Sequence, residues 1–316
     1  MTPTLIVVAS TVLMLLSMIV LIVDRAVDER QDKARKQQVA QATRELVAFA
    51  HGGGFEKNLP VGIYLTAASR LADIIKGAAY QRMITLLDRQ GWLHVYTERA
   101  FVMSNRRRYA AIKMLESFNC PLTILTLQRV MANDRLPEYR KMAALALLRF
   151  GGLPSIDSTI KFLDLTNGPT GITELAVLRE LARQDGPYLE AISREHPRAF
   201  RIAVISCLGA SNEHAIFEKL SRWAFSGDAE IAEAIATSLE WSTNSSANEI
   251  LLDLLEHHEP RVRYRALVSL WYRGHEFGEK HRRMLTATAD PYVGSVADFA
   301  WPRPRSIEIE KEAMLA

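Results

Sequence analysis

Eight histidines and two cysteines are the residues of this 316-residue sequence that could most readily bind a metal or act as nucleophiles. His257 and His258 are adjacent rather than four residues apart, and no cysteine pair has the spacing of a zinc ligand set. Cys120 precedes Pro121, and Cys207 lies in an apolar stripe, so packing explains both thiols better than catalysis does. We therefore expect neither a metal centre nor a cysteine nucleophile.

Two other catalytic patterns are incomplete. The glycines at 52–54 are not followed by the Lys-Ser/Thr of a phosphate-binding loop, and they precede no strand-to-helix unit. The Gly-X-Ser-X-Gly pattern of many serine hydrolases does not occur. With no cofactor motif in the chain, we predict a protein that is not an enzyme and holds no cofactor.

The charged residues are unevenly distributed, although the net charge is only +3. Residues 82–149 hold 12 basic and 5 acidic residues, a net of +7, whereas residues 211–260 hold 2 and 10, a net of −8. Ordinary solvated surfaces would explain both blocks. The alternative is that the acidic block is a docking surface which steers a basic protein partner. Its candidate residues are Glu213, Glu218, Glu249, Asp253 and Glu256.

Basic and aromatic residues adjoin at Asn105 to Tyr109 and at Trp301 to Arg305, which raises the alternative of nucleic-acid binding. A net charge of +3 is too small to dominate phosphate binding. We therefore expect no nucleic acid among the partners.

The amino-terminal residues 5–23 contain no charged side chain, and Ser10, Thr11 and Ser17 are their only polar residues. A helix of this length covers roughly 28 Å, close to the ~30 Å hydrocarbon thickness of a bilayer. A buried core helix and a cleaved signal peptide are the alternatives, but the flanks lack the basic start and the small-residue cleavage site of a signal peptide. The prediction is a single transmembrane helix within residues 1–23.

Basic residues follow this segment and none precedes it. Positive charge is retained on the cytoplasmic side, so we predict a single-pass protein of the cytoplasmic membrane with its amino terminus outside and its carboxyl-terminal domain inside. A membrane-proximal basic surface would lie against anionic lipid. Its candidates are Arg25, Arg30, Lys33, Arg35, Lys36, Arg106, Arg107 and Arg108.

Residues 24–50 lack proline and glycine and are rich in helix formers, which predicts a helical stalk that ends at the glycines 52–54. Ala34, Val39, Ala42 and Leu46 make a poor heptad seam, so dimerisation through the stalk stays a secondary alternative. Helices near residues 61–75 and 79–89 predict an amino-terminal cap over residues 55–104.

The remaining chain has helical periodicity only, and prolines mark its units. Pro121, Pro137, Pro154, Pro169 and Pro187 recur every 15–18 residues, and proline is tolerated at the start of a helix but not inside one. Apolar stripes of the first helices are built around alanines spaced 27–33 residues apart. These are Ala110, Ala143, Ala176, Ala203, Ala234 and Ala266. The pattern predicts an all-α solenoid of helical pairs over residues 105–301, with a last helix at 291–300 and a tail at 302–316.

Two segments resemble HEAT repeats of the short bacterial type found in phycobilisome-lyase-like proteins. One is Pro137-Glu-Tyr-Arg140-Lys-Met-Ala143 with the turn and helix that follow it, and the other is His258-Glu-Pro260-Arg-Val-Arg263-Tyr-Arg-Ala266. The resemblance implies protein binding through the second helices, and it implies that Arg107, Arg140 and Arg263 pair with acidic side chains of neighbouring units. Relatives of this kind also include chromophore lyases and DNA-repair glycosylases.

We therefore predict a membrane-anchored helical scaffold that binds a protein partner at the cytoplasmic face, as part of a membrane-associated complex. A membrane-bound glycosyltransferase is one candidate partner. An enzyme of the lyase or glycosylase kind and a nucleic-acid-binding module are the alternatives. Partner identity and oligomeric state do not follow from the sequence.

Overall fold

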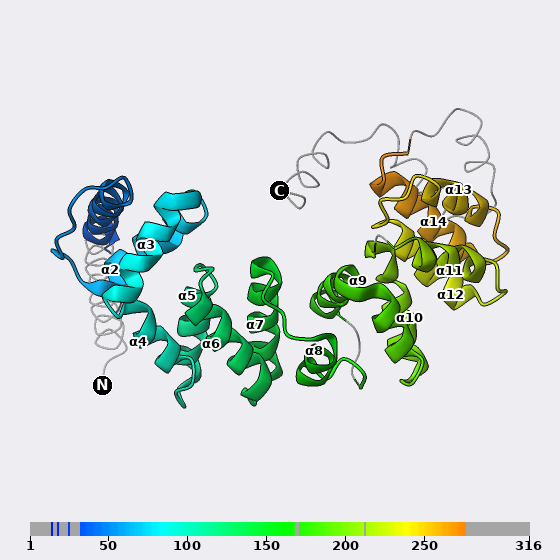
Figure 1. Cartoon of the computed structure of the whole chain (residues 1–316), viewed down its shortest axis with the longest axis horizontal. Helices are drawn as coiled ribbons and strands as arrows, with labels where there is room; N and C mark the ends of the chain where they lie inside the picture. Colours follow the sequence, from blue (N-terminus) through cyan, green and yellow to red (C-terminus); the bar gives the residue numbers. More distant parts are fainter. Residues whose placement is uncertain are drawn as a thin grey trace, which may run out of the picture. The chain divides into compact units, whose positions relative to one another are not determined.

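The computed structural model describes residues 32–167, 171–211 and 213–275, together with Met14, Met18 and Arg25. Every regular element among these residues is a helix, which confirms the all-α prediction, and successive helices pair as they do in an α-solenoid (Figure 1). The chain divides into two compact units, Met1–Val130 and Met131–Ala316.

In the N-terminal unit, the first continuously described segment opens with a helix over residues 32–50. Five further helices follow, and the last three residues of α6 fall beyond the unit's boundary. They are α2 (Val61–Ala72), α3 (Gly77–Arg89), α4 (Trp92–Arg99), α5 (Asn105–Leu115) and α6 (Pro121–Asn133). The predicted cap therefore contains three helices rather than two, because Gly91, in the left-handed region with φ +67°, lets α4 begin directly after α3.

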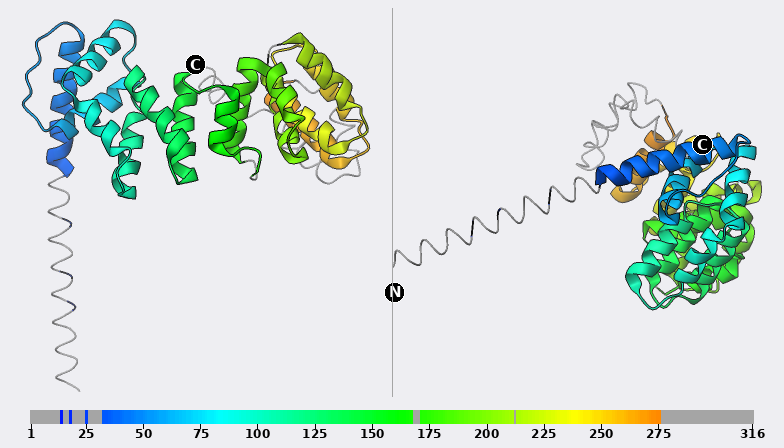
Figure 2. Two further views of the ribbon diagram at one scale, coloured as in Figure 1. Left: turned by 60° about the horizontal axis from the view of Figure 1, so that its bottom comes forward. Right: turned by 90° about the vertical axis from the view of Figure 1, so that its left-hand side faces the viewer.

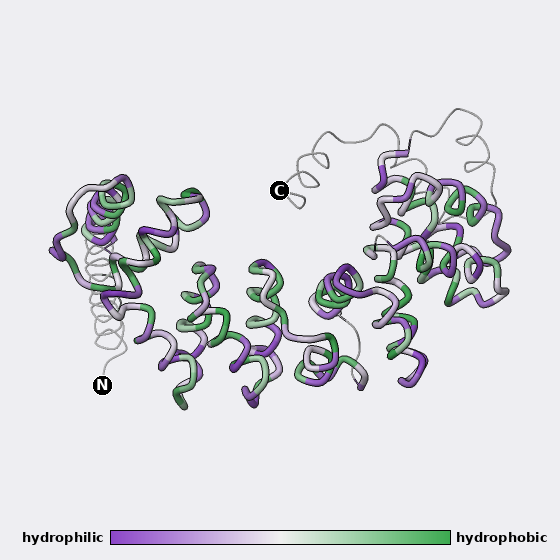
Figure 3. The backbone as a smooth tube through the Cα atoms, in the orientation of Figure 1, coloured by the Kyte–Doolittle hydropathy of each residue, from purple (hydrophilic) through white to green (hydrophobic). Residues whose placement is uncertain are grey.

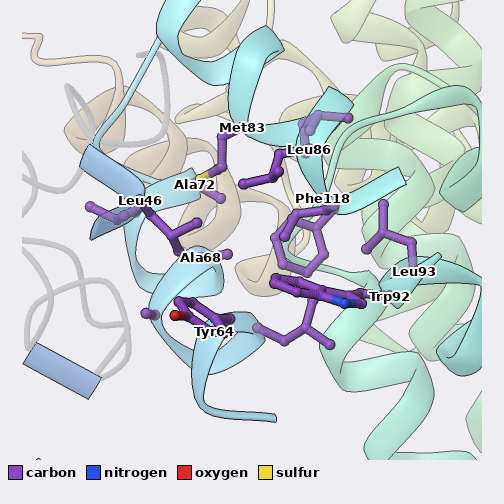
Figure 4. Packing of buried hydrophobic residues seen from close by; sticks show 14 of the residues in the cluster. Leu46, Tyr64, Ala68, Ala72, Met83, Leu86, Trp92, Leu93 and Phe118 are labelled. Atoms are coloured by element: carbon purple, nitrogen blue, oxygen red, sulfur yellow. The ribbon is translucent and has the colours of Figure 1, made fainter. Parts of the chain in front are cut away.

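Aromatic and aliphatic side chains from several of these helices meet in one core (Figure 4). The rings of Tyr64 and Trp92 stack with centroids 5.2 Å apart, and Phe55 approaches both rings edge-on. The Tyr64 hydroxyl donates a hydrogen bond to the Glu45 carboxylate. Burial, and secondarily this hydrogen bond, raises the pKa of Tyr64. Large rings with a satisfied hydroxyl thus define the centre of the unit.

Helix 32–50 belongs to this core, which corrects the predicted stalk. Val39, Ala42 and Leu46 are buried against α2 and α3, and Figure 2 shows the helix alongside the rest of the unit. The helix ends at the glycine triplet as predicted, with Gly52 at φ +101°. Three of the four residues that could have formed a heptad seam are therefore covered by the chain's own helices, and Ala34 is exposed.

The C-terminal unit repeats a pair of helices. Its helices are α7 (Pro137–Phe150), α8 (Ile156–Leu163), α9 (Ile172–Ser193), α10 (Arg198–Ile205), α11 (His214–Ala224), α12 (Ala229–Leu239), α13 (Ala247–Leu254) and α14 (Pro260–Tyr272), with a short 3₁₀ turn at Leu208–Ala210. Each helix turns hydrophobic residues inward and hydrophilic residues outward, which gives the alternating colours of Figure 3.

The helices stack in two rows. In the first row α7 contacts α9, α9 contacts α10, α10 contacts α12, and α12 contacts α14. In the second row α11 contacts the carboxyl-terminal part of α9 on one side and α13 on the other. We call the members of these rows first helices and second helices. Successive helices along the chain thus alternate between the two rows. This alternation is how solenoid repeats bury a continuous core.

Proline and other turn formers begin the helices where the sequence predicts them. Pro121, Pro137 and Pro260 open α6, α7 and α14. Gly227, at φ +82°, lies in the turn between α11 and α12. The spacing of these residues therefore sets the repeat length.

The unit that fits the repeat pattern least is α9. Its backbone breaks at Asp185, which has non-helical φ and ψ of −156° and 86°, and Pro187 follows the break. The part before Asp185 is a first helix and the part after it is a second helix. The unit is short because this kink replaces an inter-helix loop.

The alanine markers are confirmed in most repeats and wrong in one. Ala143, Ala203, Ala234 and Ala266 are buried, and Ala176 is half-buried. Ala110 is exposed, and its neighbour Ala111 is fully buried instead. The apolar stripe of α5 is set by Ala111, Ile112 and Leu115, so the marker in the sequence is displaced by one residue.

Among the described residues, none of the helices combines the length and the apolar character needed to cross a bilayer. This finding overturns the predicted location of a single-pass protein in the cytoplasmic membrane. The predicted span at residues 5–23 lies outside the described residues apart from Met14 and Met18, as do Arg30, the predicted helix 291–300 and the tail 302–316.

Candidate protein-interaction surface

The acidic residues of the first helix α12 are all engaged by arginines of neighbouring repeats. Arg198 of α10 donates to Asp228 and Glu230, at 2.7 and 3.0 Å. Two arginines of α14 reach the other acids. Arg265 lies 2.8 Å from Glu240, and the Nε of Arg261 lies 3.6 Å from Glu233. The hydrogen bond from Arg198 is the largest cause of a lowered pKa at Asp228.

The acidic residues of the second helices α11 and α13 are exposed instead. These are the five residues predicted from the sequence, Glu213, Glu218, Glu249, Asp253 and Glu256. Within the part of the chain that the structure describes, none of their carboxylates has a lysine or arginine partner, although the backbone carbonyl of Glu218 accepts a hydrogen bond from Arg222. We call these five residues the acidic surface. Because α11 and α13 contact each other, the structure brings its two parts onto adjacent helices.

The periodicity of α13 explains why its acids face outward. Ala247, Ile250, Leu251 and Leu254 are buried on one side of the helix. Glu249, Asp253 and Glu256 are spaced by four and three residues, so they share the opposite side. Like charges at this spacing repel each other, which disfavours the helix slightly unless a cation lies nearby.

On α11 the acidic surface is less uniform. Glu213 is the N-cap residue, where a negative charge is favourable. The Glu218 carboxylate lies 3.2 Å from the His214 ring on the exposed side. Lys219 turns away from this side and contacts Glu190. The negative charge is therefore most concentrated on α13.

Ion pairs with buried carboxylates connect neighbouring repeats, and the sequence did not lead us to predict them. Glu190 is 2% exposed, and it accepts hydrogen bonds from Arg194 and from Lys219 of α11. Burial alone would raise the pKa of Glu190, but these two cationic donors outweigh burial and lower it. Lys141 of α7 contacts Glu174 of α9 in the same way, and the pKa of Glu174 is lowered too, against the effect of burial.

A signal for these contacts was present in the sequence. Lys141 and Glu174 are 33 residues apart, and Arg198 and Glu230 are 32 apart, both close to one repeat length. Opposite charges that recur at the repeat spacing fall on stacked helices, so a search at that spacing would have found these pairs.

Two of the arginines that the HEAT resemblance pointed to, Arg107 and Arg140, do not pair with an acid among the described residues. Arg140 donates to the backbone carbonyl of Phe162 at 2.7 Å rather than to an acid. Arg263 donates to the carbonyls of His257 and His258. Arg107 is exposed and makes no ion pair with a described residue. Carbonyls at helix ends lack intrahelical partners, so Arg140 and Arg263 act as caps for second helices and their turns.

The predicted basic residues do not form one surface. Lys33, Arg35 and Lys36 are exposed on helix 32–50, and Arg25 is also exposed. Arg106 and Arg107 are exposed in the first turn of α5, whereas Arg108 is half-buried and bonds to Asn105.

The residues that could most readily bind a metal or act as nucleophiles are the histidines and cysteines. No group of three His, Cys, Asp or Glu side chains among them could hold a metal ion. Burial raises the pKa of the Cys207 thiol to about 11, so little reactive thiolate is present at neutral pH. His257 and His258 stack with ring centroids 4.3 Å apart, and burial lowers the pKa of His257.

Comparisons with known proteins add little to this description. No family model matches the sequence, and no curated protein matches it. Among solved structures, human deoxyhypusine hydroxylase in complex with glycerol is similar over 85% of this chain and 96% of its own, with 15% sequence identity and a TM-score of 0.30. A score this low carries no argument about function.

Proposed function

We propose that this protein is a HEAT-like scaffold that binds a basic protein partner through the acidic surface of α11 and α13. One observation supports this proposal above the others. Neighbouring arginines pair with each acid of the first helix α12, whereas the acids of the second helices beside it have no such partner among the described residues. Exposed charges of one sign steer oppositely charged proteins and set the orientation in which they dock.

The alternatives are less well supported. A lyase or glycosylase would need a cluster of polar or titratable groups around a substrate, and the described residues contain no metal-binding group and a Cys207 thiol that is largely protonated. A nucleic-acid module would need a basic second-helix row. α13 carries acids and no Lys or Arg, and on α11 Lys219 and Arg222 are balanced by Glu213 and Glu218.

The proposal is tested by affinity isolation of the full-length chain with identification of the proteins that stay bound. A triple variant, Glu249→Lys with Asp253→Lys and Glu256→Lys, is expected to lose the basic partner because attraction becomes repulsion. The matched control reverses three exposed acids elsewhere, Glu56→Lys with Asp73→Lys and Glu195→Lys, and is expected to retain it.

Two results would contradict the proposal. One is that the triple variant on α13 retains every protein that the unchanged chain captures. The other is that the purified chain shows an intrinsic cofactor absorbance or a base-excision activity, since either would place it among the enzymes.

A further inference from the structure

The turn from α4 into α5 carries exposed apolar side chains. Met103 is 93% exposed, and Phe101 and Tyr109 are close to half exposed. The guanidinium of Arg129 covers one side of the Phe101 ring at 5.1 Å. Large apolar side chains that gather in nine residues of sequence, rather than singly, mark a surface that another molecule covers.

Arginines adjoin these apolar residues. Arg106 and Arg107 are exposed in the first turn of α5 and have no acidic partner among the described residues. Arg106 and Tyr109 are three residues apart and therefore share one side of the helix. We call Phe101, Met103, Arg106, Arg107 and Tyr109 the arginine–aromatic surface. Its composition is that of a protein interface, in which Arg, Tyr, Phe and Met are enriched.

The arginines at the amino-terminal end of α5 destabilise this helix slightly. The amino-terminal end of a helix carries partial positive charge, and the first turn of α5 contains three arginines and no acid. Acidic groups from another molecule would offset this unfavourable charge. A solvated surface explains neither this arrangement nor the exposure of Met103.

We propose that the occupant of the arginine–aromatic surface is the acidic surface of a second copy of this chain. The inference rests on the proposed function, and it names one basic partner for the acidic surface. The two surfaces are complementary in charge, and Phe225, the C-cap residue of α11, is 56% exposed and adds an apolar side chain to that helix.

Because the two surfaces are different, the contact is head-to-tail. Each added copy leaves one arginine–aromatic surface and one acidic surface uncovered, so association continues into a series or closes into a ring. Self-association therefore increases with protein concentration and weakens as salt screens the charges.

The test is sedimentation velocity of the full-length chain in a mild non-ionic detergent, which keeps the uncharged residues 5–23 from associating. The first variant is Arg106→Glu with Arg107→Glu, and the second is Asp253→Lys with Glu256→Lys. Each variant alone presents two surfaces of like charge, so each is expected to associate at least about 10-fold more weakly. An equimolar mixture restores association, because every surface again meets its opposite.

A matched control separates local from general charge effects. Lys33→Glu with Lys36→Glu changes the net charge as much as the first variant does, and it is expected to associate like the unchanged chain. Circular dichroism and thermal unfolding establish that all variants are folded.

Several results would overturn the inference. The unchanged chain could stay monomeric up to about 100 µM, or the charge variants could associate normally on their own. The mixture of variants could fail to restore association, or nuclease treatment could abolish it. The last result would assign the surface to a nucleic acid. If the chain is monomeric while the α13 triple variant still loses its basic partner, the inference fails and the proposed function stands.

Discussion

The helices of the N-terminal unit and those of the C-terminal unit are held together by different interactions. In the N-terminal unit, large rings such as Tyr64 and Trp92 fill the space between helices, and the contacts link segments that do not repeat. In the C-terminal unit, the helices approach closely and ion pairs recur at the repeat spacing. The N-terminal unit is thus sensitive to lost volume, and the C-terminal unit is sensitive to added volume and to lost charge.

The largest expected effect tests whether helix 32–50 belongs to the N-terminal core. Leu46 is fully buried, so Leu46→Ala leaves a cavity and is expected to lower the free energy of unfolding by about 2–5 kcal/mol. Chemical denaturation followed by circular dichroism measures the change. Lys36→Ala, on the exposed side of the same helix, serves as the control. An unchanged stability for Leu46→Ala would mean that the helix is a free stalk after all.

The next effect tests close approach in the C-terminal unit. A Cβ atom at Gly209 would lie 1.9 Å from the Ser238 carbonyl oxygen, and the Gly209 N–H donates to the Ser238 hydroxyl at 2.6 Å. Gly209→Ala is therefore expected to cost about 3 kcal/mol, because backbone rather than a flexible side chain must move. Limited proteolysis should then cleave the C-terminal unit before the N-terminal unit. Equal protection of both units would contradict the contact.

A smaller effect depends on pH. Glu190→Gln removes the negative charge that Arg194 and Lys219 contact, and it is expected to cost about 1–2 kcal/mol at pH 7. The pKa of Glu190 is lowered in the folded chain, so its stabilisation is present above the unfolded pKa and is lost as the pH falls through the folded pKa. The two proteins should therefore converge in stability in acid, below the usual glutamate range.

The exposed Glu195→Gln is the matched control for this experiment, and it should leave the unfolding curve unchanged at every pH. A constant difference between Glu190→Gln and the unchanged chain down to strong acid would show that the charge of Glu190 is not what stabilises the stack.

The smallest expected effect comes from a glycine-to-alanine substitution in the N-terminal unit. A Cβ atom at Gly62, in the first turn of α2, meets no atom within 4 Å. Gly62→Ala is therefore expected to stabilise by up to about 1 kcal/mol, since alanine loses less backbone entropy in a helix. Thermal unfolding measures it. A loss comparable to that of Gly209→Ala would erase the contrast between the units.

Local patterns predicted much of the architecture. Proline residues set the starts of α6, α7 and α14, because a proline ring is excluded from helix interiors whatever surrounds it. The outward side of α13 also followed from spacing, since apolar and acidic residues alternate with the helical period. The exposed positions of the five acidic residues were thus available from the sequence.

Other features depended on contacts between distant residues. The repeat spacing predicted that Ala110 is buried, but its neighbour Ala111 is buried instead, because packing against other helices decides which of the two alanines faces the interior. Arg140 met a carbonyl rather than a carboxylate, since the geometry of α8 decides which acceptor lies within reach. Residues 32–50 have the composition of a solvated stalk, yet few apolar residues suffice when α2 and α3 present a complementary surface.

The sequence by itself determined that the chain is helical, where most helices begin, and that its acids and bases form separate blocks. The tertiary structure decided which of these charges form ion pairs within the chain. The acids of α12 meet arginines from α10 and α14, whereas those of α11 and α13 face outward. The physical reason is that a sequence fixes the side of its own helix on which a residue lies, but a charge is neutralised only by what another helix brings within a few ångströms.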